Sequence, residues 1–116
     1  MAFEGCIFCK IASGDIPSDR VFVDERCIAF NDLSPQAPTH ILIIPREHID
    51  SLDEASDSNS SMLGDLLITA ANIAREKGFA KNGYRVVINT NADGGQTVFH
   101  LHIHLLAGRP FVFPPG

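Results

Sequence analysis

The chain has 116 residues, 45% of them hydrophobic, and a formal net charge of −5. This length predicts a single domain spanning residues 1–116, and the apolar content excludes an intrinsically disordered chain. Binding to long DNA or RNA needs a basic face, and an acidic chain without a Lys/Arg cluster lacks one. No run approaches the roughly 18–20 apolar residues of a membrane span, so no membrane association is expected.

The N-terminus and the cysteines indicate the compartment. Residues Met1 to Glu4 contain no basic segment followed by a long apolar one, so no secretory signal is expected. Three cysteines cannot all pair within one chain, and without export they are expected to be reduced thiols or metal ligands. These observations predict a cytoplasmic protein.

The expected elements, in chain order, are short strands and two helices. A short helix is expected over Ile7 to Ala12, and a long one where apolar residues recur every three or four positions from Met62 to Ala74, ending near Gly78. One long helix between groups of strands predicts an α+β fold with a five-stranded, mostly antiparallel sheet. The expected strands are Val21–Val23, Cys27–Phe30, His40–Ile44, Tyr84–Asn89 and Val98–Leu106.

Three histidines alternate with apolar residues near the C-terminus. Successive side chains of a strand point to opposite faces, so His100, His102 and His104 are expected on one face and the residues between them on the other. Such an array can bind a metal through neutral ring nitrogens. Alternatively, one imidazole can attack an electrophile while its neighbours stabilise the developing negative charge.

Other polar residues suggest the surroundings of this array. The Gly94-Gly95 pair allows backbone N–H groups to turn toward an anion, and Gln96 and Thr97 can add donors. Asp32 precedes a proline-rich loop, where a carboxylate can either bind a sugar diol or cap a turn. His40 begins the strand after that loop, and Cys6 and Cys9 form a Cys-x-x-Cys pair, which is half of a zinc site by its spacing.

Together these residues resemble the histidine triad (HIT) family, in its nucleotide-binding (Hint) branch. The family motif is His-φ-His-φ-His-φ-φ, where φ is apolar, and residues 100–106 match every position. The likeness covers nearly the whole chain. Its further matching segments are Ile7–Ile11, Ile16–Pro17, Ala29–His40, Ile44–His48, Gly94–Thr97 and Pro114–Gly116.

The resemblance implies an assembly and an activity. It implies a homodimer in which two five-stranded antiparallel sheets, each carrying one long and one short helix, join into one continuous sheet. It also implies hydrolysis at the α-phosphate of a purine nucleotide, preferably a nucleoside phosphoramidate or an acyl-adenylate. No cofactor is then required for catalysis.

The resemblance also assigns roles to the histidines. His102 would be the nucleophile, forming a nucleotidyl-histidine that water cleaves. His100, chiefly through its backbone carbonyl, would orient the ring of His102, and His40 would support the network. Phosphate oxygens would be held by His104 and by the N–H groups near Gly95, Gln96 and Thr97.

Residues for the rest of the nucleotide follow from the same likeness. Asp32 would bind the ribose hydroxyls, while Phe30 and Leu33 would sandwich the base. Asn89 would line the phosphate site, and Thr97 would help to protonate the leaving amine.

Two features separate this chain from many eukaryotic members of the family. Those members have Trp just before the Pro-Pro-Gly ending, where this chain has Phe113, and they lack the cysteine pair. Bacterial relatives with the pair bind a structural zinc, and the matching ligands here are Cys6, Cys9, His48 and His100.

The sequence leaves three other functions as alternatives. The first is a metal-dependent hydrolase in which the three alternating histidines bind the metal directly. The second is a nucleotide-binding regulatory or scaffold protein with residual activity. The third is a dinucleoside polyphosphate hydrolase of the same family, from which the Gln96-Thr97 pair and the Pro-Pro-Gly ending lean away.

Overall fold

The structure is a computed structural model that describes residues 5–116. Residues 1–4, on which the expected absence of a secretory signal rests, lie outside the described part, as does the start of the expected 1–116 domain. Within residues 5–116, no helix combines the length and the apolar character needed to cross a membrane.

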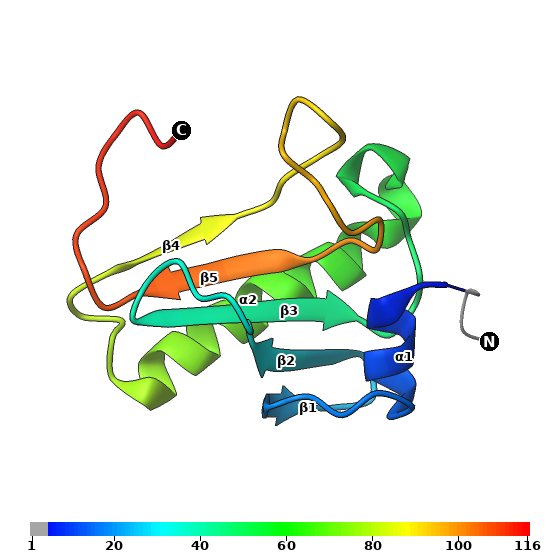
Figure 1. The fold of residues 1–116 in the computed structure, drawn as a ribbon, viewed down its shortest axis with the longest axis horizontal. Coiled ribbons are helices and arrows are strands. Elements are labelled where there is room, and N and C mark those ends of the chain that lie inside the picture. Colours follow the sequence, from blue (N-terminus) through cyan, green and yellow to red (C-terminus); the bar gives the residue numbers. More distant parts are fainter. Residues whose placement is uncertain (1–4) are drawn as a thin grey trace.

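One five-stranded antiparallel sheet forms the centre of the molecule (Figure 1). Its strand order is β1-β2-β3-β5-β4, and every neighbouring pair is antiparallel. Helix α2 connects β3 to β4, and the β4–β5 hairpin then places β5 between them. The α+β prediction is confirmed. The strands are β1 (Arg20–Val23), β2 (Cys27–Asn31), β3 (Thr39–Pro45), β4 (Tyr84–Val87) and β5 (Ile103–Ala107).

The two helices cover opposite faces of the sheet. Helix α2 (Ser60–Lys77) packs Leu66, Ala70 and Ile73 against one face, and it ends at Gly78, whose left-handed φ of 86° suits glycine. Helix α1 (Ile7–Ser13) packs Phe8 and Ile11 against the other face. Both helices were expected, and two single 3-10 turns, Leu52–Glu54 and Asp57–Asn59, precede α2.

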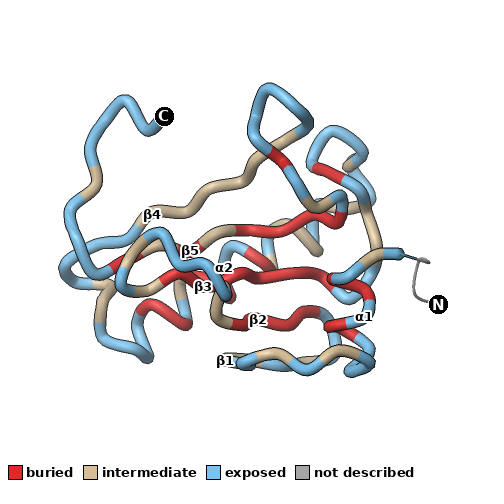
Figure 2. Tube along the Cα trace, in the orientation of Figure 1, coloured by how far each residue is buried: buried red, intermediate tan, exposed pale blue. Residues whose placement is uncertain are grey.

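Burial is concentrated in the three central strands. Figure 2 shows β2, β3 and much of β5 buried, whereas the edge strands β1 and β4 are partly exposed. Alternate residues of β3 serve the two faces: Ile41 and Ile43 pack on the α2 side, and Leu42 and Ile44 on the α1 side. The short helix α1 covers less of its face than α2 covers of the other. The α1 face therefore has room for a site.

The last strand is shorter than the histidine alternation predicts. The expected strand Val98–Leu106 begins only at Ile103, so His100 and His102 precede β5. In the preceding stretch the Leu101 N–H donates to Ile49 O at 2.7 Å, which holds the chain to the segment after β3 without a regular ladder. Leu101 still packs with the α2-side core. The alternation of faces therefore holds, although the strand bounds were wrong.

Candidate active site

His102 lies buried on the α1 face, between a backbone carbonyl and an aromatic ring. Its Nδ1 is 2.8 Å from His100 O, and a carbonyl only accepts, so Nδ1 carries the hydrogen. In a neutral imidazole this leaves Nε2 with a free lone pair. The ring of Phe8 meets the ring of His102 edge-on, at 5.0 Å and 89°. The arrangement holds an imidazole with its nucleophilic nitrogen set by the backbone.

Burial also keeps His102 neutral. Loss of solvent lowers the pKa of His102, and this outweighs the bond to His100 O and the Asp32 carboxylate, which both raise the pKa. A neutral imidazole is the form that can attack phosphorus. The geometry and the pKa therefore favour the same protonation state.

A second pair of imidazoles lies beside His102. In the β3–β5 register His40 faces Leu106 and His104 faces Leu42, so the two histidines are diagonal neighbours on one face. His40 Nε2 is 2.9 Å from His104 Nδ1, and the Asp32 carboxylate is 3.6 Å from the same His40 nitrogen. The rings of His102 and His104 are 5.0 Å apart. The sequence predicts this grouping, and the structure brings its members together.

The titration of His104 gives a test on stability. Burial, with smaller effects from the rings of His102 and His40, lowers the pKa of His104 from 6.5 to about 4. The unfolded chain then binds this proton near pH 6.5 and the folded chain only near 4. The stabilising contribution is thus fully present above pH 6.5 and is lost as pH falls toward 4. The slope is at most about 1.4 kcal/mol per pH unit, reduced because the ring is half-buried.

Urea unfolding at pH 7.5, 6 and 5 measures this effect. The His104→Asn variant, which cannot take up the proton, is the control that subtracts the titration of the carboxylates. We expect the free energy of unfolding to fall more steeply with acid in the parent than in H104N. Equal slopes in the two proteins contradict a depressed pKa for His104.

The glycine-rich loop is closed on itself by its own backbone N–H groups. The N–H groups of Gly95 and Gln96 donate to Ala92 O and Asn91 O, both at 3.0 Å, so they close the loop on itself. The side chain of Gln96 is buried, and its amide donates to Asp50 O at 2.7 Å and to Val98 O at 3.1 Å. The loop therefore uses these groups to hold its own shape, and the expected role of Gly95 and Gln96 toward phosphate stays a prediction.

Gly94 is the position at which this loop tolerates no side chain. A Cβ there would overlap Thr90 O and lie 2.7 Å from Thr90 N, both backbone atoms that cannot turn away. We expect Gly94→Ala to destabilise the protein by about 1–3 kcal/mol. Gly64→Ala in α2, where nothing lies within 4 Å of the new Cβ, is the control and should stabilise by about 0.5–1 kcal/mol. Thermal unfolding measures both, and a neutral G94A would contradict the assigned loop geometry.

The remaining expected nucleotide contacts are spread around this region. Phe30 is buried against Phe8, with ring centroids 5.7 Å apart, and Leu33 is 97% exposed in the loop after β2. Thr97 lines a hollow with Cys6 and His48, and Asn89 lines a groove that the C-terminal tail shares. Their roles stay predictions.

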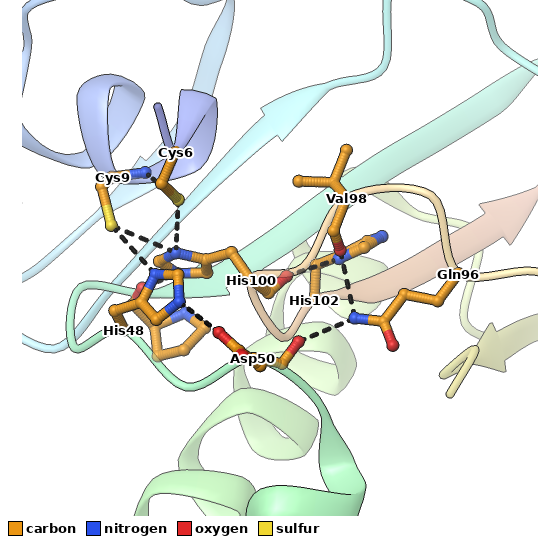
Figure 3. Close-up of polar contacts among 9 residues, drawn as sticks. Cys6, Cys9, His48, Asp50, Gln96, Val98, His100 and His102 are labelled. Atoms are coloured by element: carbon orange, nitrogen blue, oxygen red, sulfur yellow. Dashed lines mark hydrogen bonds and ion pairs between the residues drawn. The ribbon is translucent and has the colours of Figure 1, made fainter. Parts of the chain in front are cut away.

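Two cysteines and two histidines converge at the end of α1 (Figure 3). The ligand atoms of Cys6, Cys9, His48 and His100 all lie within 4.8 Å of one another. Three of the sulfur-to-Nδ1 distances are 3.2, 3.4 and 3.5 Å. Zinc bonds of about 2.3 Å to sulfur and 2.0–2.1 Å to nitrogen place tetrahedral ligands about 3.5 Å apart. The spacing therefore fits a zinc ion.

The second nitrogen of each histidine in this cluster supports the same interpretation. His48 Nε2 lies 2.6 Å from the Asp50 carboxylate, and His100 Nε2 lies 2.8 Å from Pro45 O. Both partners accept, so each Nε2 carries the hydrogen and each Nδ1 presents a lone pair to the sulfurs. Orienting partners of this kind are typical of metal-binding histidines. The donor set therefore matches the ligands that the resemblance implies.

The geometry argues against direct metal binding by the three alternating histidines. The Nδ1 of His100 faces the cysteines, whereas the Nδ1 of His102 is bonded to a carbonyl. Among residues 5–116, the groups whose ligand atoms come within 4.8 Å are the cysteine–histidine cluster and Asp32 with His40 and His104; neither contains His102. The three histidines thus divide between the cysteine–histidine cluster, which contains His100, and the neighbouring rings of His102 and His104.

Comparison with known proteins identifies the family in which these histidines occur together. The HIT domain matches residues 13–111 of the chain. The chain belongs to the HIT family. The resemblance inferred from the motif is thereby confirmed over most of the sequence.

Three relatives show how close this HIT protein lies to others of the family. It is 52% identical over 113 residues to an uncharacterized HIT-like protein of Synechococcus elongatus, covering 97% of this chain and 98% of that one. It is 50% identical over 107 residues to the purine nucleoside phosphoramidase of Escherichia coli, covering 92% and 90%. A crystal structure of a HIT family hydrolase from Legionella pneumophila superposes with a TM-score of 0.95 at 49% identity, covering 97% and 100%.

Some residues that position this site in the HIT protein were not singled out by the sequence analysis. Phe8 lies between the two cysteines and packs on His102, but an aromatic residue in a short helix is usually only a core residue. Asp50 orients His48 from two positions further along the chain, a spacing that could have drawn attention. The carbonyl of Pro45, which accepts from His100 Nε2, carries no side-chain signal at all.

Proposed function

We propose that this HIT protein is a purine nucleoside phosphoramidase. It would hydrolyse nucleoside 5′-phosphoramidates or acyl-adenylates at the α-phosphate, through a nucleotidyl-histidine on His102. The observation that carries the proposal is the buried ring of His102, whose hydrogen is fixed on Nδ1 by His100 O at 2.8 Å. The 50% identity to the E. coli purine nucleoside phosphoramidase supports the substrate class.

The proposed reaction has two displacements at phosphorus. In the first, His102 Nε2 bonds to the α-phosphorus, the bond from phosphorus to the leaving nitrogen breaks, and the amine departs with a proton. Thr97 is the proposed source or relay of that proton. In the second, water attacks the same phosphorus and gives up a proton that restores Thr97, the bond to His102 breaks, and the nucleoside monophosphate leaves with the neutral ring restored. His104 would donate a hydrogen bond to the phosphoryl oxygens in both steps.

The nucleotide would be held along the end of β2 and by the neighbouring loops. Asp32 is the proposed partner of the ribose hydroxyls, and Phe30 and Leu33 would contact the purine base. Asn89 would line the phosphate site.

We propose a structural zinc ion bound by Cys6, Cys9, His48 and His100. When bound, the ion supplies a cross-link between α1, the segment after β3 and the stretch before β5, and it takes no part in bond breaking. His100 would serve through its ring in the cluster and through its carbonyl at His102. Thiol ligands need a reducing compartment, which supports the cytoplasmic location expected from the sequence.

We also propose that the protein is a homodimer. Within residues 5–116, strand β4 lies at the edge of the sheet and pairs with β5 alone, which leaves its other side for a second copy. The outer face of α2 exposes Leu67 and Ile68 at 47% and 60%. Sedimentation equilibrium tests this, with a mass of twice 12.6 kDa expected.

The activity is tested with a panel of adenosine nucleotides. The purified protein is incubated with adenosine 5′-phosphoramidate or diadenosine tetraphosphate, and the release of AMP is followed. We expect the phosphoramidate to be cleaved at least about a hundredfold faster, judged by kcat/KM. A preference for the dinucleotide would favour the dinucleoside polyphosphate alternative. AMP binding without turnover would favour the scaffold alternative and would overturn the proposal.

A further inference from the structure

The hydrogen bond between His40 and His104 has two chemically different forms. His40 Nε2 and His104 Nδ1 are 2.9 Å apart, and in a neutral pair either nitrogen can carry the hydrogen. If it lies on His104 Nδ1, the other nitrogen of His104 is an acceptor and repels phosphate oxygens. If it lies on His40 Nε2, His104 keeps its own hydrogen on Nε2 and is a donor. The direction of this bond therefore decides what His104 can do.

A backbone group at the far end of the pair fixes this direction. The main-chain N–H of Gln36 donates to His40 Nδ1 at 3.0 Å. An amide N–H can only donate, so His40 Nδ1 is the acceptor and carries no hydrogen. The hydrogen of His40 then lies on Nε2 and is donated to His104 Nδ1, which leaves the hydrogen of His104 on Nε2. His40 is only 6% exposed, so water competes little for these bonds.

The loop that carries Gln36 is held at both ends. The Asp32 N–H donates to His40 O at 2.9 Å, and the Gln36 side chain donates to Ser34 O at 2.9 Å. From the segment after β5, the Arg109 guanidinium donates to Gln36 O at 3.2 Å. The Asp32 and Arg109 bonds, which do not involve the side chain of Gln36, keep the Gln36 amide aimed at the imidazole.

The same segment approaches the loop at a glycine. A Cβ on Gly108 would lie 2.7 Å from Pro38 Cβ, so the absence of a side chain allows the close approach. The loop before β3 and the segment after β5 are thus fitted to each other beside the histidines.

We infer that the main-chain amide of Gln36 is a positioning group for the reaction: through His40, it fixes the hydrogen of His104 on Nε2, making His104 a neutral donor toward phosphate. This inference rests on the proposed function for its catalytic meaning, but the hydrogen positions exist without substrate. The depressed pKa of His104, which burial causes, agrees with a neutral ring. Arg109 acts one step further out, through the carbonyl of Gln36.

A proline substitution isolates the backbone N–H. Gln36→Pro removes the N–H and the side chain, whereas Gln36→Ala removes only the side chain, so their difference reports the amide. Long-range 1H–15N correlation spectra of the ligand-free full chain, labelled at histidine, distinguish hydrogen on Nδ1 from hydrogen on Nε2. We expect Nε2–H for both His40 and His104 in the parent and in Q36A. In Q36P, a population of His104 with hydrogen on Nδ1 should appear.

Kinetics give the second readout. With adenosine 5′-phosphoramidate, we expect Q36P to lower kcat by about tenfold to a hundredfold, within the effect of losing one oriented donor, while Q36A stays within about twofold. KM should change little in either variant. The Arg109→Ala variant should shift the tautomers in the same direction as Q36P and by less.

The two proposals fail separately. If the parent shows hydrogen on His104 Nδ1, or if Q36P keeps the tautomers of the parent, the inference is overturned whatever the activity. If the tautomers are as expected but the parent cleaves no phosphoramidate, only the proposed function fails. If Q36P does not fold, the spectra of the parent and of R109A carry the test, and unchanged tautomers in R109A then overturn the inference.

Discussion

Replacing His102 with alanine should lower kcat for adenosine 5′-phosphoramidate by at least about a thousandfold, because the attacking nitrogen is lost. His102 Nε2 is the nitrogen left free when Nδ1 is bonded to His100 O. Neither neighbour can replace it, since the Nδ1 of His100 faces the cysteines and the Nδ1 of His104 accepts from His40. Steady-state release of AMP measures the effect.

Loss of folding must be separated from loss of chemistry in that variant. His102 is buried, and Phe8 packs on its ring, so H102A leaves a cavity beside α1. His102→Gln fills more of that space and is the matched control. Both variants should bind AMP and unfold cooperatively. A folded H102Q that retains more than about a tenth of the parent rate contradicts nucleophilic catalysis by His102.

The second large effect is expected at the cysteine–histidine cluster. Cys9→Ser removes a buried sulfur that contacts both His48 Nδ1 and His100 Nδ1. We expect the parent to be purified with the one equivalent of zinc proposed for it, and the variant without it. With free zinc a thousandfold above its Kd, the lost stabilisation is about 4 kcal/mol, or about 10–20 °C in Tm for a chain of this size.

Cys27→Ser is the matched control for this change. Cys27 is equally buried, but it lies on the α2 side, and its Sγ is 3.7 Å from Thr69 Oγ1. C27S should therefore keep its zinc, as measured by elemental analysis. A C9S protein with full zinc content and an unchanged Tm would contradict the assigned ligands.

Removal of zinc by a chelator bears on the metal-dependent alternative. In the proposed account the ion holds α1 and His100 in place and is not a reactant. The apo protein should therefore still form the covalent adduct on His102, at a lower rate. Complete loss of adduct formation in a chelated protein that remains folded, with recovery on adding zinc, would favour direct participation of the metal.

The fold was largely predictable from the sequence because its signals are local. The apolar spacing from Met62 to Ala74 and the β-branched segment His40–Ile44 identify α2 and β3 within a residue or two. The expected last strand began too early, since residues 98–102 precede β5. Alternation reports which face a side chain occupies, not which backbone groups pair. There the ring of His100 is held by Pro45 O, a partner 55 positions away.

The candidate site was predictable in its residue types but not in its division of labour. The alternation of His100, His102 and His104 looks uniform in sequence, yet one ring faces sulfur atoms, one faces a carbonyl and one faces His40. Backbone groups set these differences, and a backbone group has no signature in the residue letters. The amide of Gln36 and the self-closed loop at Gly95 were hidden for the same reason.

The cysteine–histidine cluster and His102 are linked through Phe8 of α1. The Cys6-x-x-Cys9 spacing brackets Phe8, whose ring meets both His100 and His102, at 6.0 Å and 5.0 Å. The Cys6 side chain also caps the helix, since its sulfur accepts the Cys9 N–H at 3.2 Å. A metal ion that fixed α1 through these cysteines would therefore also fix the Phe8 ring that packs on His102.

The covalent intermediate on His102 is the most direct test of the central proposal. The protein is mixed with adenosine 5′-phosphoramidate, quenched within milliseconds at a pH that preserves phosphohistidine-type bonds, and measured by intact and peptide mass spectrometry. We expect a transient population carrying one adenylyl group, located on His102 and absent in H102Q. Steady turnover with no adduct at any time, in a protein whose second step is slow enough to accumulate one, or an adduct on another residue, would contradict the account.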